Sequence, residues 1–156
     1  MSGIAHCVDD PDRGTRRTAT AKQDMITLPP DLLQRLDAAA RQASEHAYAP
    51  YSRFRVGAAC VAGSGRIYSG ANVENASFGL TICAERSALF QAVAAGERDI
   101  RAVVVYTPTP APTTPCGACR QVFCEFGGTI RVVCCCDGDE VREFASGELL
   151  PDRFQL

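Results

Sequence analysis

Two cysteines three residues apart stand in the stretch TPCGACRQVF. Proline is common at the first position of a helix, so Pro115 places Cys116 and Cys119 on the first turn of a helix, on one side of it. Two thiolates placed in this way can hold one metal ion. The same pair can also be a redox couple or two buried thiols, and the C-x-x-C pattern alone does not decide among these.

A third cysteine, Cys83, begins another helix-forming stretch, CAERSALFQAVAAG. Helix N-termini lower the pKa of a thiol and so favour the thiolates that zinc requires. With Cys116 and Cys119 this makes three thiolates, which leave the fourth tetrahedral position of zinc free for water, as in catalytic zinc sites. Glu85 lies two residues after Cys83, where a carboxylate can take a proton from that water and pass it to a substrate nitrogen.

Two other interpretations of the cysteines stay open on spacing alone. A structural zinc site would be closed by a fourth cysteine, either Cys124 or one of Cys134, Cys135 and Cys136. A redox pair is disfavoured because C-G-A-C lacks the strand-then-helix context near the chain start that is typical of thioredoxin-like proteins. The CCC run has no functional explanation in the sequence beyond the packing of small apolar side chains.

The remaining sequence predicts the elements that position these residues. LPPDLLQRLDAAARQASEHAY predicts an amphipathic helix with Asp31 as its N-cap, and FRVGAACVA and RIYSGANVE flank GSG as a hairpin. Gly96 is placed to end the helix that starts near Cys83. IRAVVVYT and TIRVVCCC predict buried strands, and VREF a short one. This order predicts an α/β fold, a three-layer α/β/α sandwich around a mixed five-stranded sheet.

Composition limits the class of protein. The chain has 156 residues, 46% hydrophobic, with a formal net charge of -2, which fits one domain. Residues 1–27 are polar and predict a mobile extension; residues 28–156 predict a single catalytic domain. Nine cysteines, an odd number, without a secretory leader indicate reduced thiols and the cytoplasm. No apolar run predicts a membrane span, and a single lysine with scattered arginines argues against nucleic acid as a partner.

Several strings together carry a resemblance to a known family. CAE and PCGAC, in combination with APYSRFRVGAA, NVENASFGLT and ELLPDRF, resemble the zinc-dependent cytidine deaminases of the small homotetrameric type. The resemblance runs from about Leu28 to the C-terminus. It implies a cytidine deaminase-like fold and one zinc ion per subunit.

The resemblance also implies a reaction. Cys83, Cys116 and Cys119 would be the zinc ligands, and Glu85 the catalytic residue that shuttles protons. Zinc-bound hydroxide would add to C4 of cytidine or 2'-deoxycytidine, and uridine or 2'-deoxyuridine and ammonia would leave, as in pyrimidine salvage. Arg86 would tune the thiolates by hydrogen bonding to them.

Substrate contacts follow from the same matches. Phe54 would pack on the pyrimidine and the backbone of Ala84 would contact the base. Asn72 and Glu74, two apart at a predicted strand end, can offer an amide and a carboxylate from one face to sugar hydroxyls, and the resemblance places them near the 3'-hydroxyl.

The resemblance further implies a homotetramer with shared active sites. Phe78 and Phe154 would approach the pocket of a neighbouring subunit. Phe78 stands where the family often has tyrosine, so one possible hydrogen bond is missing.

Three alternatives remain at this point. One is a deaminase for a modified cytosine nucleoside, although the intact NVEN string favours ordinary nucleosides. Another is a zinc-stabilised binding module in which four protein ligands close the metal site. The third, a deaminase of polynucleotides, is disfavoured by the charge balance.

Overall fold

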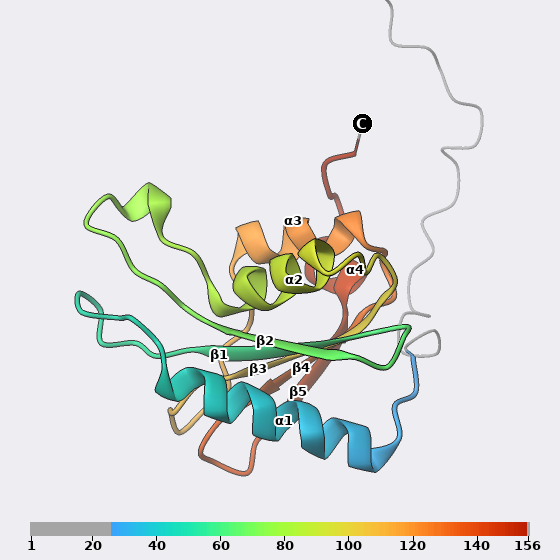
Figure 1. Cartoon of the computed structure of the whole chain (residues 1–156), viewed down its shortest axis with the longest axis horizontal. Coiled ribbons are helices and arrows are strands. Elements are labelled where there is room, and N and C mark those ends of the chain that lie inside the picture. Colours follow the sequence, from blue (N-terminus) through green and yellow to red (C-terminus); the bar gives the residue numbers. More distant parts are fainter. Residues whose placement is uncertain (1–25, 156) are drawn as a thin grey trace, which may run out of the picture.

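A computed structural model describes residues 26–155, so most of the predicted extension, residues 1–25, lies outside the described residues. Five strands form one mixed sheet in the order β2-β1-β3-β4-β5. One helix covers one face of the sheet and three helices cover the other (Figure 1). The predicted three-layer α/β/α sandwich around a mixed five-stranded sheet is therefore confirmed. Within residues 26–155, no helix is both long and apolar enough to cross a membrane.

Among the helices of residues 26–155, only α1 (Pro30–Glu45) lies on this face of the sheet (Figure 1). Leu36 and Ala40 are fully buried at its centre, as the apolar spacing predicts. The prediction that Asp31 caps this helix is wrong, because Pro29 occupies the N-cap and no side chain caps the helix start. The helix begins two residues earlier than predicted, because Pro30 has no N–H to satisfy and its fixed φ suits the first helical position. Asp31 lies in the first turn, where its charge suits the positive helix end.

The predicted hairpin is formed by β1 (Gly57–Ala62) and β2 (Ile67–Ala71), which pair antiparallel. β1 also pairs antiparallel with β3 (Ile100–Tyr106), and every residue of β1 is buried. Gly65 in the turn has φ 82°, a conformation that costs glycine little.

The helices on the second face are α2 (Ala84–Ala94), α3 (Gly117–Glu125) and α4 (Ser146–Leu149). Gly96 follows α2 with φ 93°, as predicted for a residue that ends a helix. α3 connects β3 to β4 (Arg131–Cys135), and these two strands run parallel. β5 (Arg142–Ala145) pairs antiparallel with β4 at the edge of the sheet. The sequence did not predict α4 or the short 3-10 helix η1 (Phe78–Leu80), because single turns carry too few residues to show a periodicity.

Side chains alternate between two cores along the central strands. In β3, Val103 and Val105 join the core under α2 and α3, whereas Val104 joins the core under α1. The same alternation divides the cysteine run, since Cys134 belongs to the first core and Cys135 to the second. These two thiols therefore act as small apolar groups, and burial raises the pKa of each to about 12.

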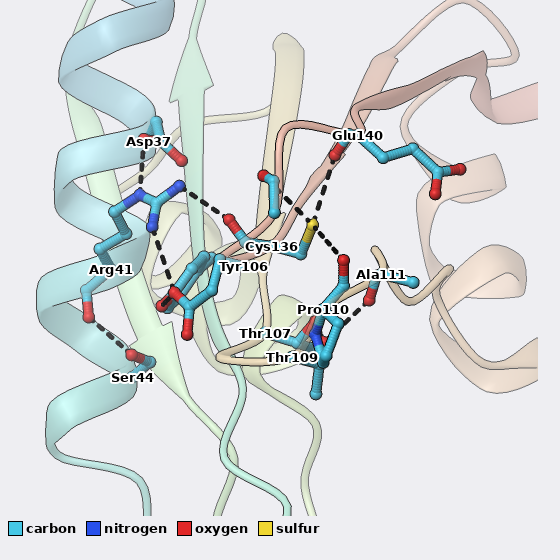
Figure 2. Close-up of polar contacts among 12 residues, drawn as sticks. Asp37, Arg41, Ser44, Tyr106, Thr107, Thr109, Pro110, Ala111, Cys136 and Glu140 are labelled. Carbon is cyan, nitrogen blue, oxygen red and sulfur yellow. Dashed lines mark hydrogen bonds and ion pairs between the residues drawn. The ribbon is translucent and has the colours of Figure 1, made fainter.

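Cys136 lies beyond the strand, and its environment differs from that of its neighbours (Figure 2). Its Sγ lies 3.4 Å from the carbonyl oxygen of Glu140, 3.5 Å from that of Gly138 and 3.6 Å from that of Pro110. The thiol thus fills the space between the turn after β4 and the loop after β3. Pro110 belongs to the loop that leads toward Cys116, so this contact helps to fix the course of that loop.

Arg41 joins α1 to the same turn (Figure 2). Its Nη2 donates to the carbonyl oxygen of Cys136 at 3.0 Å, and its Nε donates to Asp37 Oδ2 at 2.8 Å. The guanidinium carbon lies 4.3 Å from the centre of the Tyr106 ring, and the Tyr106 hydroxyl donates to Asp137. One arginine therefore ties the first helix to the ends of β3 and β4.

Two glycines of the hairpin let helices rest directly on the backbone of the sheet. A Cβ at Gly57 would lie 1.9 Å from the carbonyl oxygen of Ala40 in α1, and a Cβ at Gly70 would lie 2.5 Å from the backbone nitrogen of Ala88 in α2. Both contacts involve backbone atoms, which cannot move aside as a flexible side chain can.

We expect Gly57→Ala to lower the free energy of unfolding by about 3 kcal/mol, because the new methyl group has to push α1 away from β1. Urea denaturation measures this loss. Gly79→Ala is the matched control, since nothing lies within 4 Å of a Cβ there. Equal stability of the two variants would contradict the close packing of α1 on β1.

Candidate metal centre and active site

Two helix N-termini bring the three predicted cysteines together. Cys83 is the N-cap residue of α2, Cys116 is the N-cap residue of α3, and Cys119 lies in the first turn of α3. Both helices cover the same face of the sheet, and their starts meet above it (Figure 1). The three sulfurs therefore gather where the positive ends of two helices meet.

The sulfur spacing fits a tetrahedral zinc ion. Sγ of Cys116 lies 3.7 Å from that of Cys83 and 3.6 Å from that of Cys119, and all three sulfurs lie within 4.8 Å of one another. Zinc–sulfur bonds of about 2.3 Å at tetrahedral angles place two sulfurs roughly 3.8 Å apart. Within residues 26–155 no fourth cysteine, histidine or carboxylate joins this group. The closed four-ligand site, with Cys124 or Cys134–Cys136, is therefore not formed by the described residues.

Local charges favour a thiolate in this cluster. The pKa of Cys83 is lowered to about 5, because the nearby Cys119 thiol and, after it, the Arg86 guanidinium favour the thiolate form. Arg86 Nη2 lies 3.4 Å from Cys83 Sγ and also donates to the carbonyl oxygen of Thr81 at 3.0 Å. Since the same Nη2 also donates to Thr81, Arg86 is held in place to stabilise negative charge on sulfur.

Glu85 is the buried carboxyl group of the site, with 4% of its surface exposed. Burial raises its pKa above the ordinary value, and the nearby Cys83 sulfur adds to the shift. A raised pKa makes a carboxylate a better proton acceptor than an exposed glutamate, which suits proton transfer in a reaction.

A cavity of about 180 Å³ opens beside the sulfurs. The predicted residues Cys83, Ala84, Glu85 and Cys116 line it at one side. Its other walls include the predicted Phe54 and Asn72 and six residues that the sequence analysis missed: Val56, Thr81, Val105, Thr107, Thr113 and Thr114. Thr113 and Thr114 directly precede PCGAC, and this adjacency was the one signal that could have identified them.

Asn72 supports the wall of this cavity through its amide. Its Nδ2 donates to the carbonyl oxygen of Phe54 at 2.8 Å, and its Oδ1 accepts from the N–H of Val56 at 2.8 Å. The side chain is 7% exposed. Asn72 thus fixes the backbone on both sides of Arg55 and with it the position of Phe54 in the cavity.

A second hollow adjoins the first and shares Thr81 with it. The other residues lining it are Tyr51, Ser52, Glu74 and Phe78. Glu74 and Asn72, predicted to act side by side, therefore line neighbouring hollows. Phe78 is 78% exposed, and its ring packs edge-on against Tyr51, with 6.4 Å between the centroids.

Among the described residues, Phe154 is the one predicted site residue that neither lines these hollows nor belongs to the sulfur cluster and its arginine. It lies in a separate depression beside Cys124 and Glu125. Its backbone exchanges two hydrogen bonds with the Gln121 side chain, at 3.0 Å and 3.2 Å. Phe154 is 68% exposed.

Comparison with known proteins identifies the family. A model described as the cytidine and deoxycytidylate deaminase zinc-binding region matches residues 31–136, more than half of the chain. The chain belongs to this family. Its zinc-binding region contains all three clustered sulfurs, so zinc is the metal for which the cluster is arranged.

Individual members of the deaminase family are similar over most of their length. The cytidine deaminase of Halalkalibacterium halodurans is 50% identical over 115 residues, which cover 72% of this chain and 86% of the relative. That of Sporosarcina psychrophila is 44% identical over 123 residues, 78% and 90% of the two chains. The crystal structure of cytidine deaminase from Burkholderia pseudomallei is 52% identical, with a TM-score of 0.75, and the match covers 78% of this chain and 98% of that one. The predicted cytidine deaminase-like fold is confirmed.

We expect Cys119→Ala to lower the zinc content of the purified deaminase-family chain from about one ion per chain to well below half, because two thiolates hold zinc far less tightly than three. Metal analysis by mass spectrometry measures this content, and circular dichroism checks that the variant folds. Cys124→Ala is the matched control from the same helix, and its zinc content should equal that of the parent chain.

Proposed function

We propose that this protein converts cytidine and 2'-deoxycytidine to uridine and 2'-deoxyuridine by hydrolysis, with release of ammonia. The observation that carries the proposal is the position of Glu85, a buried carboxyl group that lines the same cavity as two of three clustered sulfurs. Relatives that are 44–50% identical over most of the chain are named cytidine deaminase, which supports the choice of substrate.

Cys83, Cys116 and Cys119 would hold the zinc ion. Zinc, when bound, acidifies water and makes it a nucleophile at neutral pH. Arg86 stabilises the charge on Cys83 through the contact described above.

Glu85 moves the protons of the reaction. It takes a proton from the attacking water and delivers it to N3 of the cytosine ring, while oxygen bonds to C4. A second proton then passes through Glu85 to the amino group, the C4–N bond breaks, and ammonia leaves. The raised pKa of Glu85 suits both the uptake and the release of a proton.

The two hollows divide the substrate into base and sugar. A volume of about 180 Å³ beside the sulfurs is below the range of roughly 300 Å³ and above that is typical of pockets for whole ligands. The base would occupy this cavity, with Phe54 against the ring and the Ala84 backbone at its edge. The sugar would extend past Thr81, which lines both hollows, toward Glu74, and Asn72 would reach it from the wall of the first cavity.

The assembly and the cellular setting are part of the proposal. Phe78 and Phe154 are large, exposed aromatic side chains, which supports a homotetramer in which neighbouring subunits cover them and complete each other's sites. We place the enzyme in pyrimidine salvage in the cytoplasm. Light scattering that finds a stable, fully active monomer would contradict the tetramer.

The reaction is tested with purified protein and cytidine or 2'-deoxycytidine, followed by chromatography of the products. Uridine or 2'-deoxyuridine should appear, and a zinc chelator should suppress both. Zinc-loaded protein that forms neither product would overturn the proposal.

We expect Glu85→Gln to lower turnover of cytidine by about 10²–10⁴-fold, because the amide fills the same space but cannot carry the protons. Zinc content should stay at the level of the parent chain, since Glu85 is not a ligand. Steady-state kinetics with metal analysis of the same sample measures both. Glu45→Gln, at the exposed end of α1, is the control and should leave turnover unchanged.

A further inference from the structure

Ser52 connects the two hollows through a single hydroxyl group. Its Oγ donates to Oε1 of Glu74, which lines the second hollow. The same Oγ accepts the backbone N–H of Phe54, which lines the first, at 2.9 Å. One oxygen atom therefore contacts the carboxylate on one side and the segment that carries the aromatic wall on the other.

The carboxylate of Glu74 is held by three donors. Oε2 accepts the N–H groups of Tyr51 and Ser52 at 2.8 Å and 3.2 Å, and Oε1 accepts the Ser52 hydroxyl. The Ser52 hydroxyl is also the main cause of a lowered Glu74 pKa, so the group stays ionised and acts only as an acceptor. A carboxylate has about four acceptor positions, and three of them are occupied. The fourth is on Oε1, the oxygen that Ser52 already contacts.

Phe54 is fixed from both sides of its own backbone. Ser52 Oγ accepts its N–H, and Asn72 Nδ2 donates to its carbonyl oxygen. The residue before it, Arg53, has φ 58°, a left-handed conformation that costs a non-glycine residue free energy and persists only when the surroundings impose it. Ser52 and Asn72 supply these surroundings.

We propose that Ser52 is a positioning residue that couples recognition of one sugar hydroxyl by Glu74 to the placement of Phe54 against the base. This proposal rests on the proposed function. A sugar hydroxyl that donates to Oε1 shares that oxygen with the Ser52 hydroxyl, so the two hydrogen bonds depend on one orientation of the carboxylate. Without Ser52, Oε1 loses its anchor, and the sugar hydroxyl has to order the carboxylate itself. The contact then discriminates less between substrates with and without that hydroxyl.

The chain contains a matched arrangement far from the hollows. Ser64 Oγ donates to Glu97 Oε1 at 2.6 Å and lies 3.4 Å from the N–H of Arg66, also two residues further along the chain. This serine lies at the turn of the β1–β2 hairpin and makes the same pair of contacts. Ser64→Ala therefore removes an equivalent hydroxyl without touching either hollow.

The test compares cytidine with 3'-deoxycytidine, which lacks the hydroxyl assigned to Glu74. For each enzyme the ratio of kcat/KM for the two substrates is the readout. We expect Ser52→Ala to lower kcat/KM for both substrates, but to lower it about tenfold more for cytidine, so that the ratio falls about tenfold. Ser52→Thr keeps the hydroxyl and should keep most of the ratio, and Ser64→Ala should keep all of it.

The outcomes separate the coupling from the proposed function. A loss of folded protein would lower kcat/KM by the same factor for both substrates and leave the ratio unchanged. Thermal melting of each variant would detect such a loss independently. A ratio that is unchanged or higher in Ser52→Ala overturns the coupling while leaving the reaction intact. A parent enzyme that turns over cytidine and 3'-deoxycytidine equally well overturns the role of Glu74 and the coupling with it. A zinc-loaded parent enzyme that turns over neither substrate overturns the proposed function itself.

Discussion

The structure depends on the meeting of two helix N-termini above one face of the sheet. Like ends of helices repel one another, because each carries partial positive charge from unpaired N–H groups. The sulfurs of Cys83, Cys116 and Cys119 lie at that meeting point, and negative charge on sulfur offsets the repulsion. The metal centre and the helix arrangement therefore stabilise each other. Negatively charged sulfurs held close together would in turn repel one another. The positive charge of the Arg86 guanidinium, which lies against Cys83, reduces this repulsion.

The fold and the metal cluster could be predicted from sequence because their signals are local. Helical spacing in α1, alternation around the Gly65 turn and the buried run of β3 each lie within one short window of residues. The cysteines could be grouped because Cys116 and Cys119 share the first turn of one predicted helix and Cys83 begins another. The N-cap assignment of Asp31 failed because Pro30 itself suits the first helical position, which moves the helix start two residues ahead of the predicted one.

The walls of the site were harder to predict because they depend on how loops fold over the sheet. The sequence did not predict that the amide of Asn72 pairs with the backbone of Phe54 and Val56. No spacing rule links residues so far apart. The cysteine run shows the same limit, because three identical neighbours occupy three environments. Cys134 and Cys135 pack on opposite faces of the sheet, and Cys136 contacts carbonyl groups of two loops.

The close approach at Gly70 bears on how the site withstands change elsewhere in the chain. A helix that rests on side chains shifts when those side chains change in size, and every group on its first turn shifts with it. α2 meets the sheet at Gly70 through backbone atoms, whose dimensions are the same in every protein. Its height above the sheet is therefore fixed by covalent geometry. Substitutions among the apolar residues around it can alter stability while Cys83 and Glu85, at the start of the same helix, keep their distance from the sheet.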